Sequence, residues 1–198
     1  SGDYSLRITQ SGDVDFKNPF TVTLQSSEAL LEIEPNNGAD AATALPKGEA
    51  RQGLLFSGDR DVYAFTLDYP QFVDLDLSAQ STFGEYTITL CKGDLEHPID
   101  GTVSENGQAA GLEVGLTQGT YFWVVSSDGD LDDQALYSLS WDTAQSTGLE
   151  IEPNNNLDFA NGLDTQSARQ GRIYSQEDQD LYGFSLQEES LFTLNFTP

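Results

Sequence analysis

The sequence predicts an all-β protein, an antiparallel β-sandwich, because apolar and polar residues alternate in many short runs. Turns rich in Gly, Asp and Ser separate these runs, as expected when each sheet turns one face to a core and the other to water. In chain order the runs are Tyr4–Ile8, Phe20–Leu24, Tyr63–Leu67, Val73–Leu77, Tyr86–Leu90, Tyr121–Val125, Tyr137–Trp141, Tyr182–Leu186 and Phe192–Phe196. Only Gly38–Leu45 predicts a helix, and it would have barely two turns.

A duplication sets the organisation of the chain. The string Leu-Glu-Ile-Glu-Pro-Asn-Asn occurs at 31–37 and again at 149–155, and Arg-Gln-Gly follows at 51–53 and 169–171. An acidic cluster running into Tyr-x-Phe then follows in both copies. Pro35 and Pro153 lie 118 positions apart, and Asp61 and Asp180 lie 119 apart. So long a period indicates duplicated domains and not a solenoid of short repeats.

The copies predict one complete sandwich and one half. We call residues 31–142 the full unit and residues 149–198, which repeat only its first half, the half-unit; the polar stretch 142–148 links them. Residues 1–30 would hold the terminal strand or strands of a preceding or split unit. Because a half-sandwich leaves sheet edges open, we expect the strands in 1–24 to complete the half-unit. Completion within the same chain is favoured slightly over completion in a neighbouring molecule.

The composition restricts the possible partners. The net charge is -25, from 33 acidic residues against 8 Lys plus Arg. Such a charge repels nucleic acid and anionic membranes, and it suits divalent cations, high salt or simple solubility. No run of 18 apolar residues occurs, so no membrane insertion is expected. The only cysteine, Cys91, cannot form an intramolecular disulfide and is expected to be buried. The first residue is not Met, which indicates a processed or excised segment.

Carboxylates and amides at alternate positions indicate a calcium site in each copy. Alternate residues of an extended segment point to one side, so Glu32, Glu34 and Asn36 could converge, with acids before the next strand adding ligands. Such hard oxygen donors are those Ca²⁺ takes, whereas zinc and copper prefer His or Cys. The candidate metal ligands are Glu32, Glu34, Asn36, Asn37, Asp59, Asp61, Glu150, Glu152, Asn154, Asn155, Glu177 and Asp180.

A plainer interpretation competes with calcium at each acidic stretch of the chain. The Asn pairs could cap backbone groups in Asx-turns while the acids stay solvated. A second acidic stretch, Asp128–Asp133, alternates like a calcium loop but lacks the spacing of an EF-hand, and a solvated hairpin loop is favoured there.

Catalysis has little support, because His97 is the only histidine and its polar surroundings predict an exposed loop.

The motifs together resemble a known family. Glu-Pro-Asn-Asn precedes Gly-Asp-x-Asp-x-Tyr-x-Phe at 58–65, and Gly-x-Tyr at 119–121 precedes Tyr-x-Leu at 137–139. This order is similar to the bacterial pre-peptidase C-terminal (PPC) domain, a family that includes the collagen-binding domains of clostridial collagenases. The resemblance covers 31–141, 149–198 and, more weakly, 1–8. It implies a jelly-roll-like β-sandwich that is a secreted, non-catalytic appendage of proteases and other exported proteins.

The resemblance also implies a ligand set for Ca²⁺. By position, it gives Glu32, Glu34, Asn36, Asn37 and Asp61 in the full unit, and Glu150, Glu152, Asn154, Glu177 and Asp180 in the half-unit. Calcium-binding members place an acid three residues before the aspartate that precedes the strand. Glu177 has that spacing to Asp180, but Gly58 occupies the position before Asp61, so Asp59 would have to substitute. The second site is therefore the better calcium candidate.

The predicted function is that of a non-catalytic, calcium-binding module of a larger secreted or cell-surface bacterial protein, acting in attachment or positioning. Its partners would be an extracellular peptide, protein or glycan and the neighbouring repeats of the parent chain. An alternative is an adhesin-type domain that recognises a peptide or glycan, with Tyr69, Phe83 and Tyr86 as candidate contacts. A hydrolase that uses acidic residues is the third possibility.

Overall fold

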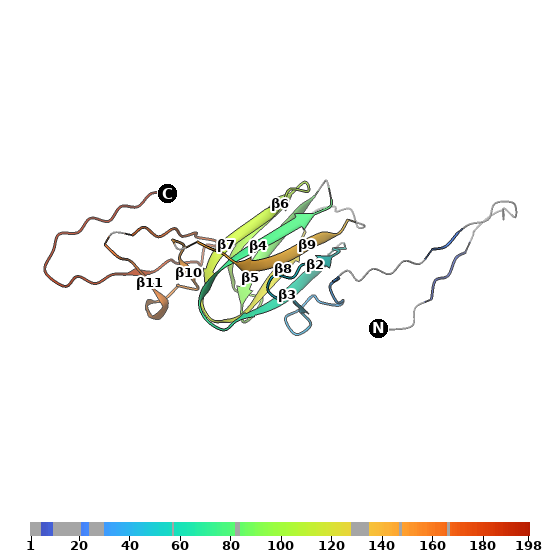
Figure 1. Ribbon diagram of the computed structural model, residues 1–198, viewed down its shortest axis with the longest axis horizontal. Helices are drawn as coiled ribbons and strands as arrows, with labels where there is room; N and C mark the ends of the chain where they lie inside the picture. Colours follow the sequence, from blue (N-terminus) through green and yellow to red (C-terminus); the bar gives the residue numbers. More distant parts are fainter. Residues whose placement is uncertain are drawn as a thin grey trace.

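Two five-stranded sheets form the centre of the molecule (Figure 1). A computed structural model describes residues 5–9, 21–23, 30–56, 58–81, 84–127, 135–146, 148–165 and 167–198. The sheets pack face to face with the core between them, so the prediction of an all-β sandwich is confirmed. Among the described residues, no helix has the length and hydropathy needed to cross a bilayer.

The first sheet has the order β1-β3-β8-β5-β6. Its strands are β1 (Thr43–Ala44), β3 (Arg60–Leu67), β8 (Gly119–Ser126), β5 (Glu85–Lys92) and β6 (Pro98–Glu105). All neighbours are antiparallel except β1 and β3, which pair in parallel. The sequence pattern predicted parts of β3, β5 and β8 but not β6, which carries few apolar residues.

The second sheet has the order β10-β7-β4-β9-β2 and includes a strand from the half-unit. Its strands are β10 (Ile151–Glu152), β7 (Ala110–Leu116), β4 (Gln71–Ala79), β9 (Tyr137–Thr143) and β2 (Arg51–Gly53). β10 pairs in parallel with the edge strand β7, so the start of the half-unit extends a sheet of the full unit.

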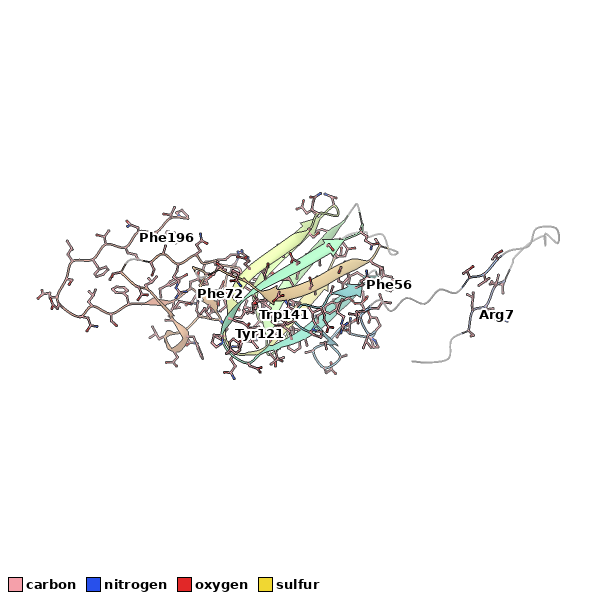
Figure 2. All side chains as sticks on the ribbon, in the orientation of Figure 1. Arg7, Phe56, Phe72, Tyr121, Trp141 and Phe196 are labelled. Carbon is pink, nitrogen blue, oxygen red and sulfur yellow. The ribbon has the colours of Figure 1, made fainter. Side chains whose placement is uncertain are left out.

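The core follows from the alternation. In β4, Val73, Leu75 and Leu77 are fully buried while Asp76 between them is exposed. Phe65 of β3 stacks on Tyr121 and Trp123 of the same sheet and meets Trp141 of the opposite sheet, with ring centroids 4.7 Å apart. Figure 2 shows Tyr121 and Trp141 within the sandwich. The buried core cluster runs from Leu45 to Trp141, so it belongs entirely to the full unit.

The predicted helix over Gly38–Leu45 is wrong. This segment makes a turn and then the short strand β1; Thr43 of β1 and Leu45, which follows the strand, are both buried. The parallel pairing of Thr43 with Tyr63 holds it extended. Tertiary pairing has overridden the helix propensity of the alanines.

The half-unit forms less sheet than predicted. It has a 3₁₀ turn, η1 (Leu157–Phe159), and a two-stranded sheet of β11 (Asn161–Gly162) and β12 (Tyr182–Gly183). The strand predicted over Tyr182–Leu186 is therefore only two residues long, and Phe192–Phe196 forms no strand, with Phe196 85% exposed. Their counterparts in the full unit, β3 and β4, are stabilised by pairing with β7, β8 and β9, which have no counterpart in 149–198.

The described parts of the N-terminal segment do not complete the half-unit. Residues 5–9 and 21–23 form no strand, and Figure 1 places them at the opposite end of the sandwich from residues 149–198. The side chains of Leu6, Ile8 and Val22 are exposed. Completion within one chain is thus not seen in these ranges, and the domain boundaries stay a prediction. Tyr4, Phe20 and Leu24 lie outside the described residues.

Candidate metal centres

The residues following Leu31 and Leu149 bring carboxylates together in both copies. We call residues 31–37 and 149–155 the entrance segments. Glu32 and Glu34 of the first segment meet Asp61 of β3, with one oxygen from each within 4.8 Å of the others. We call these three residues the first cluster. Glu150, Glu152 and Asp180 meet in the same way and form the second cluster.

Hydrogen bonds fix the carboxylates of the first cluster. Glu32 accepts from the backbone N–H of Leu54 at 2.7 Å and from the hydroxyl of Tyr63 at 2.8 Å. The hydroxyl of Tyr137, on the closing strand β9, donates to Asp61. Gly53 is required beside these groups, because a Cβ there would lie 2.2 Å from the Tyr137 hydroxyl oxygen. The carboxylates are held in place before any ligand binds.

Two buried oxygens of the first site have no hydrogen-bond partner among the described residues. Asn36 is fully buried, and its amide nitrogen donates to Glu32 at 3.2 Å and to Thr43 at 3.4 Å, which leaves Oδ1 unbonded. Oδ1 of the fully buried Asp61 is also without a hydrogen-bond partner among the described residues. Buried polar atoms are nearly always satisfied, and an orphaned pair calls for an explanation such as a bound ion.

Burial and the neighbouring acids both disfavour the charged form of the carboxyl groups in the first cluster. Burial, together with the charge of Glu32, raises the pKa of Asp61 to about 9, even though the hydrogen bond from Tyr137 acts to lower it. Burial is also the main cause that raises the pKa of Glu34, and Asp59 and Glu32 add to it. A divalent cation would offset both causes.

The second cluster repeats these contacts. Glu150 accepts from the backbone N–H of Arg172 at 2.6 Å and from the hydroxyl of Tyr182 at 2.8 Å. Glu152 accepts from the backbone N–H of Asn154 at 2.9 Å. Oε1 of Glu152 and Oδ1 of Asp180 have no hydrogen-bond partner within the described part of the chain. Burial first, and then the charge of Glu150, raises the pKa of Glu152 to about 8 and that of Asp180 to about 7.

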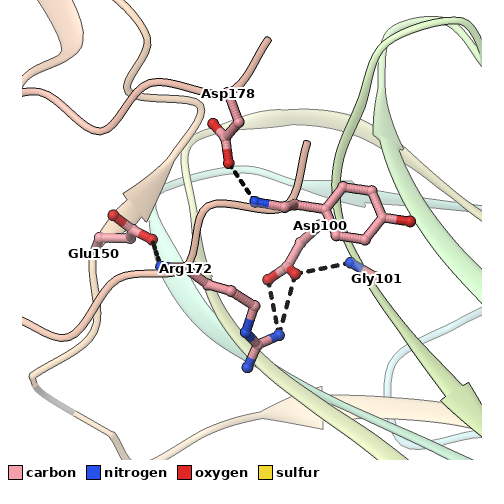
Figure 3. A network of polar contacts seen from close by, with 6 residues as sticks. Asp100, Gly101, Glu150, Arg172 and Asp178 are labelled. Carbon is pink, nitrogen blue, oxygen red and sulfur yellow. Dashed lines mark hydrogen bonds and ion pairs between the residues drawn. The ribbon is translucent and has the colours of Figure 1, made fainter. Parts of the chain in front are cut away.

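The two sites differ in their surroundings. In the first, Glu34 is exposed; in the second, Glu150 and Glu152 are both buried because β10 lies against β7. Figure 3 shows Arg172 of the half-unit beside the buried Asp100 of β6, with Nη1 and Oδ1 3.1 Å apart. The second site therefore lies at the junction of the two units.

Several predicted ligands lie outside the clusters. Asn37 and Asn155 are exposed, unlike the buried Asn36 and Asn154. The carbonyl of Asn37 accepts from Arg60 at 2.8 Å. Asp59 and Glu177 are not in the two groups of converging carboxylates. Their assignment as ligands remains a prediction.

The sequence reasoning missed Asp178. Its charge raises the pKa of both Glu152 and Asp180, so it acts on the second cluster as Asp59 acts on the first. The duplication contained the signal, because Asp59 and Asp178 each precede the cluster aspartate by two residues. The spacing expected from the PPC resemblance, an acid three residues before Asp180, predicted its neighbour Glu177 as the ligand instead.

The surroundings of His97 and Cys91 disfavour a reactive role for either residue. His97 is 75% exposed and contacts Asp94, as expected for a loop histidine. Cys91 is buried, and burial raises its pKa to about 11, which disfavours the thiolate. Of the aromatic contacts suggested for an adhesin, Tyr69 is exposed but Tyr86 is buried in the core. Phe83 and the acidic stretch 128–133 lie outside the described residues.

Comparison with known proteins finds that the chain is similar in sequence to a collagenase. The chain is 24% identical over 210 residues to collagenase ColA of Clostridium perfringens, covering 96% of this chain and 18% of ColA. The chain is similar to a PPC domain. The match to a collagenase agrees with the resemblance that the motifs carry. The chain spans less than a fifth of the length of this curated relative.

One solved structure is a further match. The PPC domain of a collagenase from Bacillus anthracis is 20% identical, with a TM-score of 0.41, over 60% of this chain and 99% of that one. No family model matches the chain.

Proposed function

We propose that this chain is a non-catalytic, calcium-binding module of a larger secreted bacterial protein, in which it serves attachment or positioning. The observation that supports calcium most directly is the set of orphaned buried oxygens at the two clusters, Asn36 Oδ1 and Asp61 Oδ1 at the first and Glu152 Oε1 and Asp180 Oδ1 at the second. Ca²⁺ takes six to eight oxygen ligands at ~2.3–2.6 Å and accepts irregular geometry. Carboxylates with an amide oxygen in the first site form such a set, and neither cluster includes a histidine or cysteine.

Cation binding would act mainly through folding energy. A ligand that binds only the folded state stabilises it by mass action, by ~2.7 kcal/mol at a concentration one hundred times Kd. Each site joins an entrance segment to a strand or segment about thirty residues later, so a bound ion would fix the start of each unit against its sheet. At the second site it would also fix the half-unit against the full unit.

Calcium titration of the intact chain tests the metal assignment. Calorimetry should give two binding events, with Glu34→Gln removing one and Glu152→Gln removing the other. Glu188→Gln, an exposed carboxylate of the half-unit, is the matched control and should leave both. A melting curve that does not change between excess Ca²⁺ and chelator would sink the proposal, and equal affinity for Mg²⁺ would argue against calcium in particular.

The attachment role rests on the similarity to a collagenase. We propose an extracellular protein as the partner and fibrillar collagen as the first probe. Co-sedimentation of the intact chain with insoluble collagen fibrils, with Ca²⁺ and with chelator, measures this directly. Retention on fibrils with Ca²⁺ is the expected result. If the chain binds Ca²⁺ but never sediments with fibrils, the metal assignment stands and collagen is not the partner.

A further inference from the structure

The second entrance segment docks on strand β7 of the full unit. The first entrance segment has an equivalent docking surface, which has no partner among the described residues. In the second copy, β10 lies along β7, and the backbone N–H of Thr117 donates to the carbonyl of Glu152 at 3.0 Å. In the first copy, the equivalent carbonyl is that of Glu34, and no hydrogen bond reaches it among the described residues. Ile33, the counterpart of the half-buried Ile151, is 73% exposed.

The two segments have the same local geometry. The backbone N–H of Ile33 donates to Thr43 Oγ1 at 3.1 Å, and that of Ile151 donates to Asn161 Oδ1 at 2.8 Å. Each segment therefore bonds its own unit through two backbone N–H groups, that of Glu32 or Glu150 to the carbonyl of Gln52 or Gln170, and that of Ile33 or Ile151 as above. Within the described residues, only the second segment has a sheet edge opposite its remaining carbonyl, that of Glu152.

The docking contacts of the second copy rely on two glycines of the full unit. A Cβ on Gly115 of β7 would lie 2.2 Å from the carbonyl oxygen of Glu150, and one on Gly101 of β6 would lie 2.6 Å from the hydroxyl of Tyr174. At Gly115 the backbone of the half-unit thus approaches the full unit as closely as glycine permits, and at Gly101 the side chain of Tyr174 does so. Arg172 completes the contact by pairing with Asp100.

At the positions of Arg172 and Tyr174, the first copy has Leu54 and Phe56. Phe56 is 56% exposed and lies at the surface in Figure 2. Together with Ile33, these residues give the first copy an apolar version of the docking face. Leu54 cannot neutralise a buried acid, so this face does not suit an edge that carries Asp100.

We propose that Leu31–Glu34, with Leu54 and Phe56, docks on the free β7 edge of another sandwich of this kind. That partner would have glycine where the full unit has Gly101 and Gly115, and an uncharged residue where it has Asp100. The docked strand would extend the partner's sheet in parallel, as β10 extends the sheet of the full unit. Successive units would then join through a shared sheet and not through a loose linker.

A chain in which residues 31–148 are duplicated tests this docking. The leading unit, with Asp100→Leu, is followed through its natural linker by a trailing unit and the half-unit. A photoreactive benzoylphenylalanine replaces Phe56 in the trailing unit. On illumination we expect a crosslink to β6 of the leading unit. The Asp100→Leu substitution changes the mass of that peptide and so distinguishes it from β6 of the trailing unit. The linker holds the two units at high effective concentration, so weak docking would be seen.

Two blocking variants decide the outcome. Gly115→Val in the leading unit closes the acceptor edge, and Ile33→Asp in the trailing unit places a charge on the exposed donor segment without touching either core. Each should lower the crosslink yield at least tenfold, and restoring Asp100 should lower it severalfold. The same photoreactive group in place of Tyr174 of the half-unit should crosslink to β6 of the trailing unit. No crosslink to the leading β6, or a yield that survives both blocks, would overturn the proposal. The measurement does not depend on which metal binds.

Discussion

Replacing Glu152 by glutamine should stabilise the metal-free protein and abolish its response to calcium at the second site. The carboxylate is 3% exposed, and one of its oxygens has no partner within the described structure. Burial raises its pKa from 4.5 to about 8. Because the folded pKa is raised, the group's contribution to stability is complete below pH 4.5 and is lost as the pH rises toward 8.

The size of the effect follows from that shift. One pKa unit corresponds to ~1.4 kcal/mol, so by pH 7 the buried carboxyl group destabilises the metal-free fold by roughly 3 kcal/mol. Glutamine keeps the shape without the charge. In chelator at pH 7 the variant should therefore be more stable than the wild type by up to that amount, whereas near pH 4.5 the two should nearly coincide.

Scanning calorimetry in chelator across this pH range measures the difference. Hydrogen exchange of residues 149–155 then reports the half-unit itself, because both tryptophans, Trp123 and Trp141, lie in the full unit. Added Ca²⁺ should reverse the order, stabilising the wild type and not the docked strand of the variant. A variant that is less stable than the wild type in chelator at pH 7, or that keeps the full calcium response, would refute the reasoning.

Three further predictions concern the residues around the clusters. Asp178→Asn should weaken calcium binding at the second site several-fold and Glu177→Gln should not, as calorimetric titration can show; the reverse ranking would favour the family spacing. Tyr137→Phe removes the hydroxyl that donates to Asp61, so calcium should bind the first site at least threefold more weakly while the second site serves as an internal control. Gly53→Ala should destabilise the full unit by about 1–3 kcal/mol in denaturant unfolding, because its Cβ has no room; an unchanged midpoint would contradict this.

Much of the fold could be predicted from alternation alone. The runs that became β3, β4, β5, β8 and β9 place alternate residues in the core between the sheets, and period-two patterns predict that directly. β6 could not be found in this way, because Pro98–Glu105 has few apolar residues and is held by pairing with β5. The converse failure is Phe192–Phe196, which has the pattern of a strand but no partner strand among the described residues.

The convergence of the carboxylates was predictable from the sequence, but their setting was not. Alternation within Glu-x-Glu-x-Asn placed the carboxylates on one side, and the clusters contain the expected Glu32, Glu34 and Asp61. The partners of those carboxylates come from distant strands, as with Tyr137 on Asp61, and no local pattern encodes such a contact. The pairing of β10 with β7 was equally hidden, because two residues of strand leave no periodic signal.

The duplication has given two clusters of the same three carboxylates with different electrostatics, and docking accounts for the difference. In both copies an extended segment places two glutamates beside an aspartate. Within the described part of the chain, a neighbouring sheet covers only the second segment, and there Glu152 is buried whereas its counterpart Glu34 stays exposed. Burying a carboxylate under a neighbouring sheet raises its pKa, so a nearby cation stabilises its charged form more strongly. If another sandwich covers Leu31–Glu34 as we propose, the first site should acquire a buried carboxylate with a raised pKa, as the second site has. The contact that joins two units would then also set how strongly the site between them binds a cation.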